Sequence, residues 1–184
     1  MTHSSTPSKE VQEMVAQADT GARNPSGIPG HILWFVPLCW SLFQLWYASP
    51  LPFIFDFAIL NDTEARSIHL MFAVFLAFTA YPAMKRSPRD RIPLIDWILA
   101  LLGSLSAAYI YLFYTELAGR SGAPTDFDIA ISVIGMILLL EATRRALGPP
   151  LMVVAALFLL YNFAGPHMPD VIAHKGASLN KAMS

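Results

Sequence analysis

Five apolar stretches, separated by short polar loops, dominate the chain and cover residues 32–47, 68–84, 94–114, 127–140 and 151–164. Each is long enough, or nearly so, to cross a hydrocarbon core about 30 Å thick, which takes about 20 helical residues. Backbone amides find no hydrogen-bond partner in lipid, so a crossing segment must be a helix or part of a closed barrel. The alternating pattern of barrel strands is absent. The sequence therefore predicts an all-α fold, a polytopic membrane helix bundle of about four to five transmembrane helices.

The composition agrees with a protein that lies mostly in a membrane. Apolar residues make up 55% of the chain and charged residues 14%, whereas soluble domains carry about 25% charged residues. The net charge is -1, so no basic field predicts nucleic acid as a partner. The single cysteine, Cys39, lies in the first apolar stretch and can form no internal disulfide. Membrane lipids are therefore the expected surroundings of most of the chain.

Three regions follow from the order of polar and apolar segments. Residues 1–30 are polar and form a cytoplasmic N-terminal segment, either disordered or folded as a short surface helix over residues 11–18. Residues 31–147 form a four-helix membrane domain. Residues 148–184 hold a fifth, shorter apolar helix and an extracytoplasmic tail. The first stretch is interpreted as a retained helix, because the region after it lacks the small residues of a signal-peptide cleavage site.

Charged residues in the loops predict the orientation. The loop 85–91 holds four basic residues in seven, and Arg144 and Arg145 follow the fourth stretch on the same side. The remaining loops are acidic or mixed. Because basic loops stay in the cytoplasm, the N-terminus is predicted to be cytoplasmic.

Local motifs predict several helix ends. Asp96 lies near the start of the third stretch, where the helix dipole favours a carboxylate. Thr125 and Asp128 have the spacing of a capping box before the fourth stretch. Gly148 and Pro149 are expected to end that helix.

Glu141 ends an apolar run and is followed by Arg144 and Arg145, three and four residues on and therefore on the same helical face. One interpretation is an ion-pair latch at the cytoplasmic end of the helix, or a contact to another subunit. The other is an interfacial pair, in which the carboxylate is neutralised locally and the arginines extend to lipid phosphates.

Two further polar residues lie within apolar stretches. Gln44 and His69 are expected to make polar contacts between helices. The third stretch carries small residues that would allow close helix packing: Gly103, Ser104, Ser106, Ala107 and Ala108. No nucleotide-binding loop, zinc motif or serine elbow is present in the sequence. The chain is therefore not expected to be an enzyme, and no catalytic, substrate-binding or metal-ligating residue and no cofactor is predicted.

Several strings together resemble one family of membrane proteins. They are SLFQLWY at 41–47, RSIHL at 66–70, YP at 81–82, IDW at 95–97, EATRRALG at 141–148, LLYNFAGP at 159–166 and AHKG at 173–176. In this order and spacing they resemble the N-terminal part of a tripartite ATP-independent periplasmic (TRAP) transporter permease, of the TAXI subtype.

The resemblance implies a function as part of a secondary transporter in the bacterial inner membrane. In this family an extracytoplasmic solute-binding protein captures an organic solute, and a large membrane subunit imports it with a sodium gradient. The small-subunit region is a static scaffold around which the large subunit moves. The implied partners are therefore the large TRAP membrane subunit, separate or fused, and the binding protein. The fifth stretch allows either a separate small subunit with an extra helix or the front portion of a fused permease.

A small helical bundle with many aromatic residues also suggests an alternative. It could be the membrane anchor of a redox enzyme that binds haem or a quinone. Haem in such a bundle needs paired histidines on facing helices. His69 lies near the start of the second stretch, and the other histidines fall at the ends of the chain or in loops.

Overall fold

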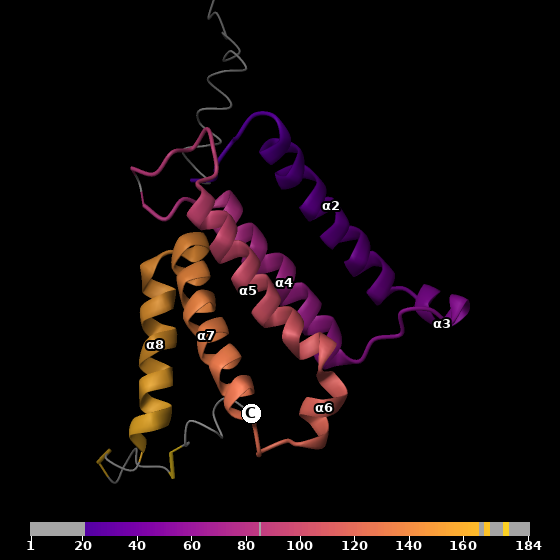
Figure 1. Cartoon of the computed structure of the whole chain (residues 1–184), viewed down its shortest axis with the longest axis vertical. Helices are drawn as coiled ribbons and strands as arrows, with labels where there is room; N and C mark the ends of the chain where they lie inside the picture. Colours follow the sequence, from indigo (N-terminus) through magenta and orange to yellow (C-terminus); the bar gives the residue numbers. More distant parts are fainter. Residues whose placement is uncertain (1–20, 85, 166–167, 170–174, 177–184) are drawn as a thin grey trace, which may run out of the picture.

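The computed structural model describes residues 21–84, 86–165, 168–169 and 175–176. All regular structure in these ranges is helical, without a strand. The helices are α2 (Ile28–Ala48), α3 (Leu51–Phe55), α4 (Asp62–Ala80), α5 (Leu94–Leu112), α6 (Tyr114–Gly119), α7 (Asp126–Leu147) and α8 (Pro149–Ala164) (Figure 1). The surface helix expected over residues 11–18 lies outside the described ranges.

The five long helices run alternately up and down (Figure 1). Helices α4, α5 and α7 pack against one another at the centre, and the α4–α5 contact is the most extensive. Helix α2 packs against α4 on one side, and α8 packs against α7 on the other. The short helix α3 follows α2, and α6 continues from α5 at the same end of the bundle (Figure 1).

Small side chains allow the central helices to approach closely. A Cβ atom added to Gly103 would lie only 2.5 Å from Val74 Cγ1 of α4. The Ser104 hydroxyl donates to the Met71 carbonyl across the same contact, at 3.2 Å. The buried apolar residues include many alanines beside a few larger side chains: Ala65, Val74, Ala77, Phe78, Ala100, Ala107, Leu138 and Ala142. The predicted small-residue face of the third stretch is confirmed.

Helix α4 differs most from the sequence expectation, because it covers Asp62–Ala80 rather than residues 68–84. Its first turn is polar but helical, since the Asn61 side chain accepts from the Glu64 N–H at 3.0 Å and the Glu64 carboxylate accepts from the Asn61 N–H at 2.9 Å. This capping box stabilises a turn that lies before the apolar run. The helix ends because Tyr81, which precedes a proline, takes an extended conformation.

The other ends follow the sequence more closely. Helix α2 begins at Ile28, within the polar segment expected over residues 1–30. The third stretch is interrupted at Phe113, so that α5 and α6 are separate helices. The capping box of Thr125 and Asp128 and the helix end at Gly148 are confirmed.

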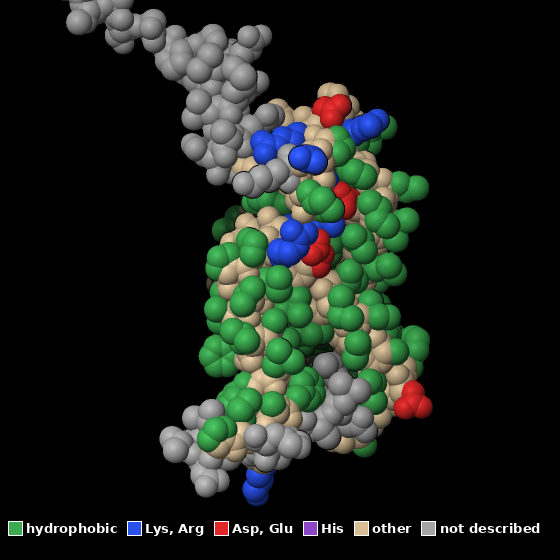
Figure 2. Space-filling model, turned by 90° about the vertical axis from the view of Figure 1, so that its left-hand side faces the viewer, with side chains coloured by type: hydrophobic (Ala, Val, Ile, Leu, Met, Phe, Trp, Pro, Cys, Tyr) green, Lys and Arg blue, Asp and Glu red, His purple; other side chains and the backbone are tan. Residues whose placement is uncertain are grey.

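Within the described residues, two helices meet the length and composition of a membrane-crossing segment: α2, with 21 residues, and α5, with 19. Helix α8 is apolar but shorter, with 16 residues. Figure 2 shows one face of the molecule, on which hydrophobic side chains form a broad band with Lys and Arg gathered above it.

Candidate functional site

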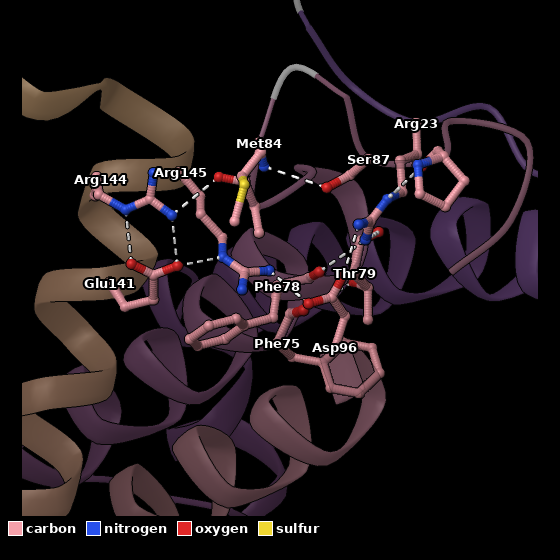
Figure 3. Close-up of polar contacts among 12 residues, drawn as sticks. Arg23, Phe75, Phe78, Thr79, Met84, Ser87, Asp96, Glu141, Arg144 and Arg145 are labelled. Atoms are coloured by element: carbon pink, nitrogen blue, oxygen red, sulfur yellow. Dashed lines mark hydrogen bonds and ion pairs between the residues drawn. The ribbon is translucent and has the colours of Figure 1, made fainter. Parts of the chain in front are cut away.

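Five charged side chains form a network at the end of the bundle where α5 begins and α7 ends (Figure 3). Arg23 comes from the segment before α2, Asp96 from the first turn of α5, and Glu141, Arg144 and Arg145 from the last turns of α7. The network therefore joins segments that are far apart in the sequence. We refer to these five residues as the charge network.

Asp96 is the centre of the charge network. Its side chain is 3% exposed, with Oδ2 accepting from Arg23 Nη2 at 2.5 Å and Oδ1 from Arg145 Nη1 at 2.8 Å. The side chains of Arg23 and Arg145 are 0% and 4% exposed. One buried carboxylate thus pairs with two buried guanidinium groups, and Glu141 supplies a second negative charge to Arg145. Its place in the first turn of α5 adds the favourable effect of the helix dipole.

Arg23 also binds the end of α4. Its Nη1 donates to the carbonyls of Phe78 and Thr79 at 3.1 and 3.2 Å, and its Nε donates to the Pro88 carbonyl at 3.3 Å. Its backbone N–H donates to the Ala80 carbonyl at 2.7 Å. The last carbonyls of a helix have no partner within the helix. Arg23 supplies these partners and so attaches the segment before α2 to both α4 and α5.

Glu141 connects the remaining two arginines. Its carboxylate accepts from Arg144 through Nε and Nη2 and from Arg145 through Nε, each at 2.7 Å. Arg144 also donates to the Ala83 carbonyl at 3.0 Å, and the Arg145 guanidinium lies 4.7 Å from the centre of the Phe78 ring. The geometry matches an ion-pair latch. Arg145 turns into the bundle rather than outward, so the interfacial interpretation does not describe it.

The arrangement favours a structural role for the charge network. A buried ion pair loses hydration that its attraction only partly restores, but removal of one partner leaves a costly unpaired charge. The carboxylates and guanidinium groups hydrogen-bond one another and backbone carbonyls. The network therefore fixes the relative positions of α4, α5, α7 and the segment before α2.

The structure places His69 in a contact between helices. Its Nδ1 accepts from Trp40 Nε1 of α2 at 2.7 Å. The rings of Phe43 and Tyr47, also from α2, lie with their centres 5.0 and 6.5 Å from the His69 ring. Gln44 is exposed on α2, and its side chain makes no hydrogen bond within the described part of the chain. It joins neither His69 nor the charge network.

Two members of the charge network were missed at the level of sequence. Arg23 lies in a polar segment whose sequence gives no sign of burial. Asp96 was assigned only a favourable place at a helix start. Its signal was an acidic residue within an apolar stretch, at the same end of the bundle as Arg145. In the described part of the chain, no group of three or more His, Cys, Asp or Glu side chains is arranged to hold a metal ion.

A smaller network lies at the opposite end of the bundle. The Asp128 carboxylate accepts from the Tyr109 hydroxyl at 2.5 Å, from Arg120 Nη2 at 2.9 Å and from the Thr125 N–H at 2.8 Å. Arg120 is more accessible than the arginines that bind Asp96, with 35% of its side chain exposed. This network joins α5, the α6–α7 loop and the start of α7.

The chain matches no family model, and no curated protein or solved structure is significantly similar to it. Residues from four of the strings noted in the sequence take part in contacts between helices. Segment 41–47 contributes Phe43 and Tyr47, whose rings contact His69. Segment 95–97 contributes Asp96, segment 141–148 contributes Glu141, Arg144 and Arg145, and segment 66–70 contributes His69.

Proposed function

We propose that the chain is a membrane-embedded scaffold of a TRAP-type secondary transporter. In this proposal it supports a large membrane subunit that imports an organic solute, delivered by an extracytoplasmic binding protein and driven by an ion gradient. One observation carries the membrane part of the proposal: polar and charged groups lie inside the bundle ends, whereas large apolar side chains face outward. The resemblance of the sequence strings supports the transporter family.

The outward apolar side chains lie on the long helices. Trp34 and Leu45 of α2 are each 68% exposed, Leu105 of α5 is 62% exposed and Phe158 of α8 is 69% exposed. Soluble monomers rarely present large continuous apolar patches to water. Lipid chains solvate the same side chains without cost, which favours a bilayer around the bundle.

The lengths of the helices support four crossings. Helices α4 and α7 have 19 and 22 residues and so compare with α2 and α5. At about 1.5 Å per residue, each is about 28–33 Å long. Their charged residues lie in the first two and last two turns, near the expected membrane surfaces. Helix α8 is shorter, at about 24 Å, and would cross only with local thinning of the bilayer.

The distribution of charge supports the orientation. The basic loop, Arg23 and the arginines that end α7 lie at one end of the bundle, whereas Asp62, Glu116 and Asp126 lie at the other. In our proposal the basic end is cytoplasmic in a bacterial inner membrane, with the N-terminus on that side.

Labelling of introduced cysteines in intact cells tests this topology. In a Cys39→Ser background, Glu116→Cys should react with a membrane-impermeant maleimide, and Arg86→Cys should react only after the membrane is permeabilised. The reverse pattern, or recovery of the chain in the soluble fraction, would contradict the proposal.

The scaffold role is tested by assembly. Glu141 and Arg144 are 30% and 32% exposed, so their outer surfaces are accessible to a second subunit. We expect Glu141→Ala to reduce copurification with the large membrane subunit and to lower solute uptake. Glu116→Ala, at an exposed position at the opposite end of the bundle, is the matched control. Unchanged assembly and uptake would remove Glu141 from the contact surface, and copurification with a flavin or iron–sulfur subunit would favour the redox-anchor alternative.

A further inference from the structure

A cavity lies along the line of contact, or seam, between α5 and α7, and α4 also contributes to its walls. Its volume is about 250 Å³, and its walls include Val74, Gly103, Ser106, Ser132, Gly135 and Leu139. We call this space the seam cavity. A Cβ atom added to Gly135 would lie 3.2 Å from Ser106 Cβ, so the backbones of α5 and α7 approach closely beside it. The small side chains at this seam leave part of the space unfilled.

A second and more polar cavity adjoins the first toward α6. It has a volume of about 460 Å³ and includes Thr63, Tyr114, Arg120, Ser121 and Asp128 in its walls. We call this space the vestibule. Tyr109, Ile110 and Ser132 line both cavities, which shows that they are neighbours. Together they form a space that is apolar at the level of the helix centres and polar at the helix ends.

We propose that this space binds one phospholipid, with an acyl chain in the seam cavity and the phosphate in the vestibule beside Arg120 and Ser121. The inference rests on the membrane location proposed above. The acyl chain of such a ligand matches the apolar seam cavity, and its phosphate matches the polar vestibule. Ile110 of α5 lines both cavities and is 38% exposed, and Ile131 of α7 lines the seam cavity, so apolar side chains border the space on both helices.

The groups in the vestibule suit a phosphate. Asp128 already accepts three hydrogen bonds, one of them from Arg120, so its charge is compensated. A guanidinium carries five N–H donors. Arg120 gives one of them, on Nη2, to Asp128, and 35% of its side chain is exposed beside the vestibule.

The apolar part of the space suits a hydrocarbon chain. Atoms that line a void lose dispersion contacts on one side. An acyl chain restores these contacts without placing a polar group among Val74, Leu139 and the other apolar side chains. A free anion would fill the vestibule only and leave the seam cavity empty.

The first test counts phospholipids on the purified full-length chain by native mass spectrometry in a mild detergent. We expect one retained phospholipid per wild-type chain. Ser106→Leu fills the seam cavity and should reduce this retention by about tenfold. The Ser106 hydroxyl donates to the Leu102 carbonyl of its own helix, at 2.9 Å, so its removal breaks no hydrogen bond between helices. Ala130→Leu, at an exposed position of α7 that lines neither cavity, should retain the lipid.

Equal phospholipid retention by Ser106→Leu and the wild type would overturn the inference. So would the absence of bound phospholipid from wild-type protein that was purified from the membrane fraction. The proposed membrane location would still stand, because that location fails only if the chain is recovered in the soluble fraction.

A second measurement does not depend on a bulky substitution. In the delipidated Cys39→Ser/Ser106→Cys variant, added phosphatidylglycerol should slow the reaction of the thiol with a small maleimide by about tenfold. Inorganic phosphate should leave the rate unchanged. A rate insensitive to phosphatidylglycerol, or equally slowed by phosphate alone, would overturn lipid binding in the seam cavity.

Discussion

The two ends of the bundle hold their helices together in different ways. At one end, which we call the clamped end, Asp96 binds two arginines that are almost completely buried. At the other, the open end, Asp128 binds Arg120, which is one-third exposed and faces the vestibule. At both ends, therefore, a carboxylate connects α5 with other segments, but the exposure of the arginines that bind it differs. Both carboxylates are 3% exposed, but only at the clamped end are the arginines that bind the carboxylate buried as well.

This difference bears on how the chain would work as a scaffold. The clamped end fixes α4, α5, α7 and the segment before α2 in one arrangement, because each change of position would expose or separate buried charges. The open end has fewer direct contacts and a cavity between the helices. We therefore expect the scaffold to be rigid at the clamped end and adaptable at the open end.

The largest effect is expected for Asp96→Ala. It leaves the guanidinium groups of Arg23 and Arg145 buried without their shared carboxylate, which should lower the free energy of unfolding by about 3–5 kcal/mol. Unfolding in mixed detergent micelles measures this change. Asp62→Ala is the control, because Asp62 pairs with Arg66 at an exposed site where the two side chains are 70% and 78% exposed.

Asp128→Ala removes the corresponding carboxylate at the open end and measures how strongly that end is held. Arg120 can turn toward solvent when its partner is lost, so the decrease in stability should be smaller than that of Asp96→Ala. An equal or larger decrease would show that the two ends are held with similar strength.

The next largest effect is expected for Arg23→Ala. Asp96 keeps Arg145, but the carbonyls that end α4 lose their side-chain donor, at an expected cost of about 2–4 kcal/mol. Hydrogen exchange should increase at the end of α4 and not at its start. Arg86→Ala, an exposed residue of the basic loop, should leave both measurements unchanged.

Close packing of α4 and α5 predicts an intermediate effect. Gly103→Ala places a methyl group against Val74 and should destabilise the bundle by about 1–3 kcal/mol. Gly119→Ala of α6 meets no atom within 4 Å and is the matched control. A stabilised Gly103→Ala variant would show that the two helices separate easily, against the arrangement described here.

The smallest effect is expected for Trp40→Phe. It removes the hydrogen bond to His69 while keeping an aromatic ring between α2 and α4, at an expected cost of about 1 kcal/mol. Trp34→Phe, at an exposed site of the same helix, provides the comparison. If the two variants are equally stable, the hydrogen bond contributes nothing to the attachment of α2.

The sequence predicted the helical architecture because the apolar runs are long and their ends carry strong local signals. Gly148 and the pair Thr125 and Asp128 act through contacts within a few residues, so their roles could be inferred without the fold. Glu141 and its arginines could be grouped for the same reason. The start of α4 at Asp62 was missed because a capping box stabilised a turn that has no apolar pattern.

The centre of the charge network could not be predicted in the same way. Arg23 and Asp96 are separated by 73 residues and meet only when α4 and α5 pack together. The role of Gln44 also depends on tertiary structure, since the face of α2 that it occupies is decided by how α2 packs against α4. Interactions between distant segments thus account for most of what the sequence left open.

Distance measurements between spin labels test the contrast between the two ends most directly. In a Cys39→Ser background reconstituted into lipid nanodiscs, one label pair at Ile95 and Leu147 reports the clamped end, and a second at Leu112 and Asp126 reports the open end. The account predicts a narrow distance distribution for the first pair and a broader one for the second. Equal widths, or a broader distribution at the clamped end, would contradict it.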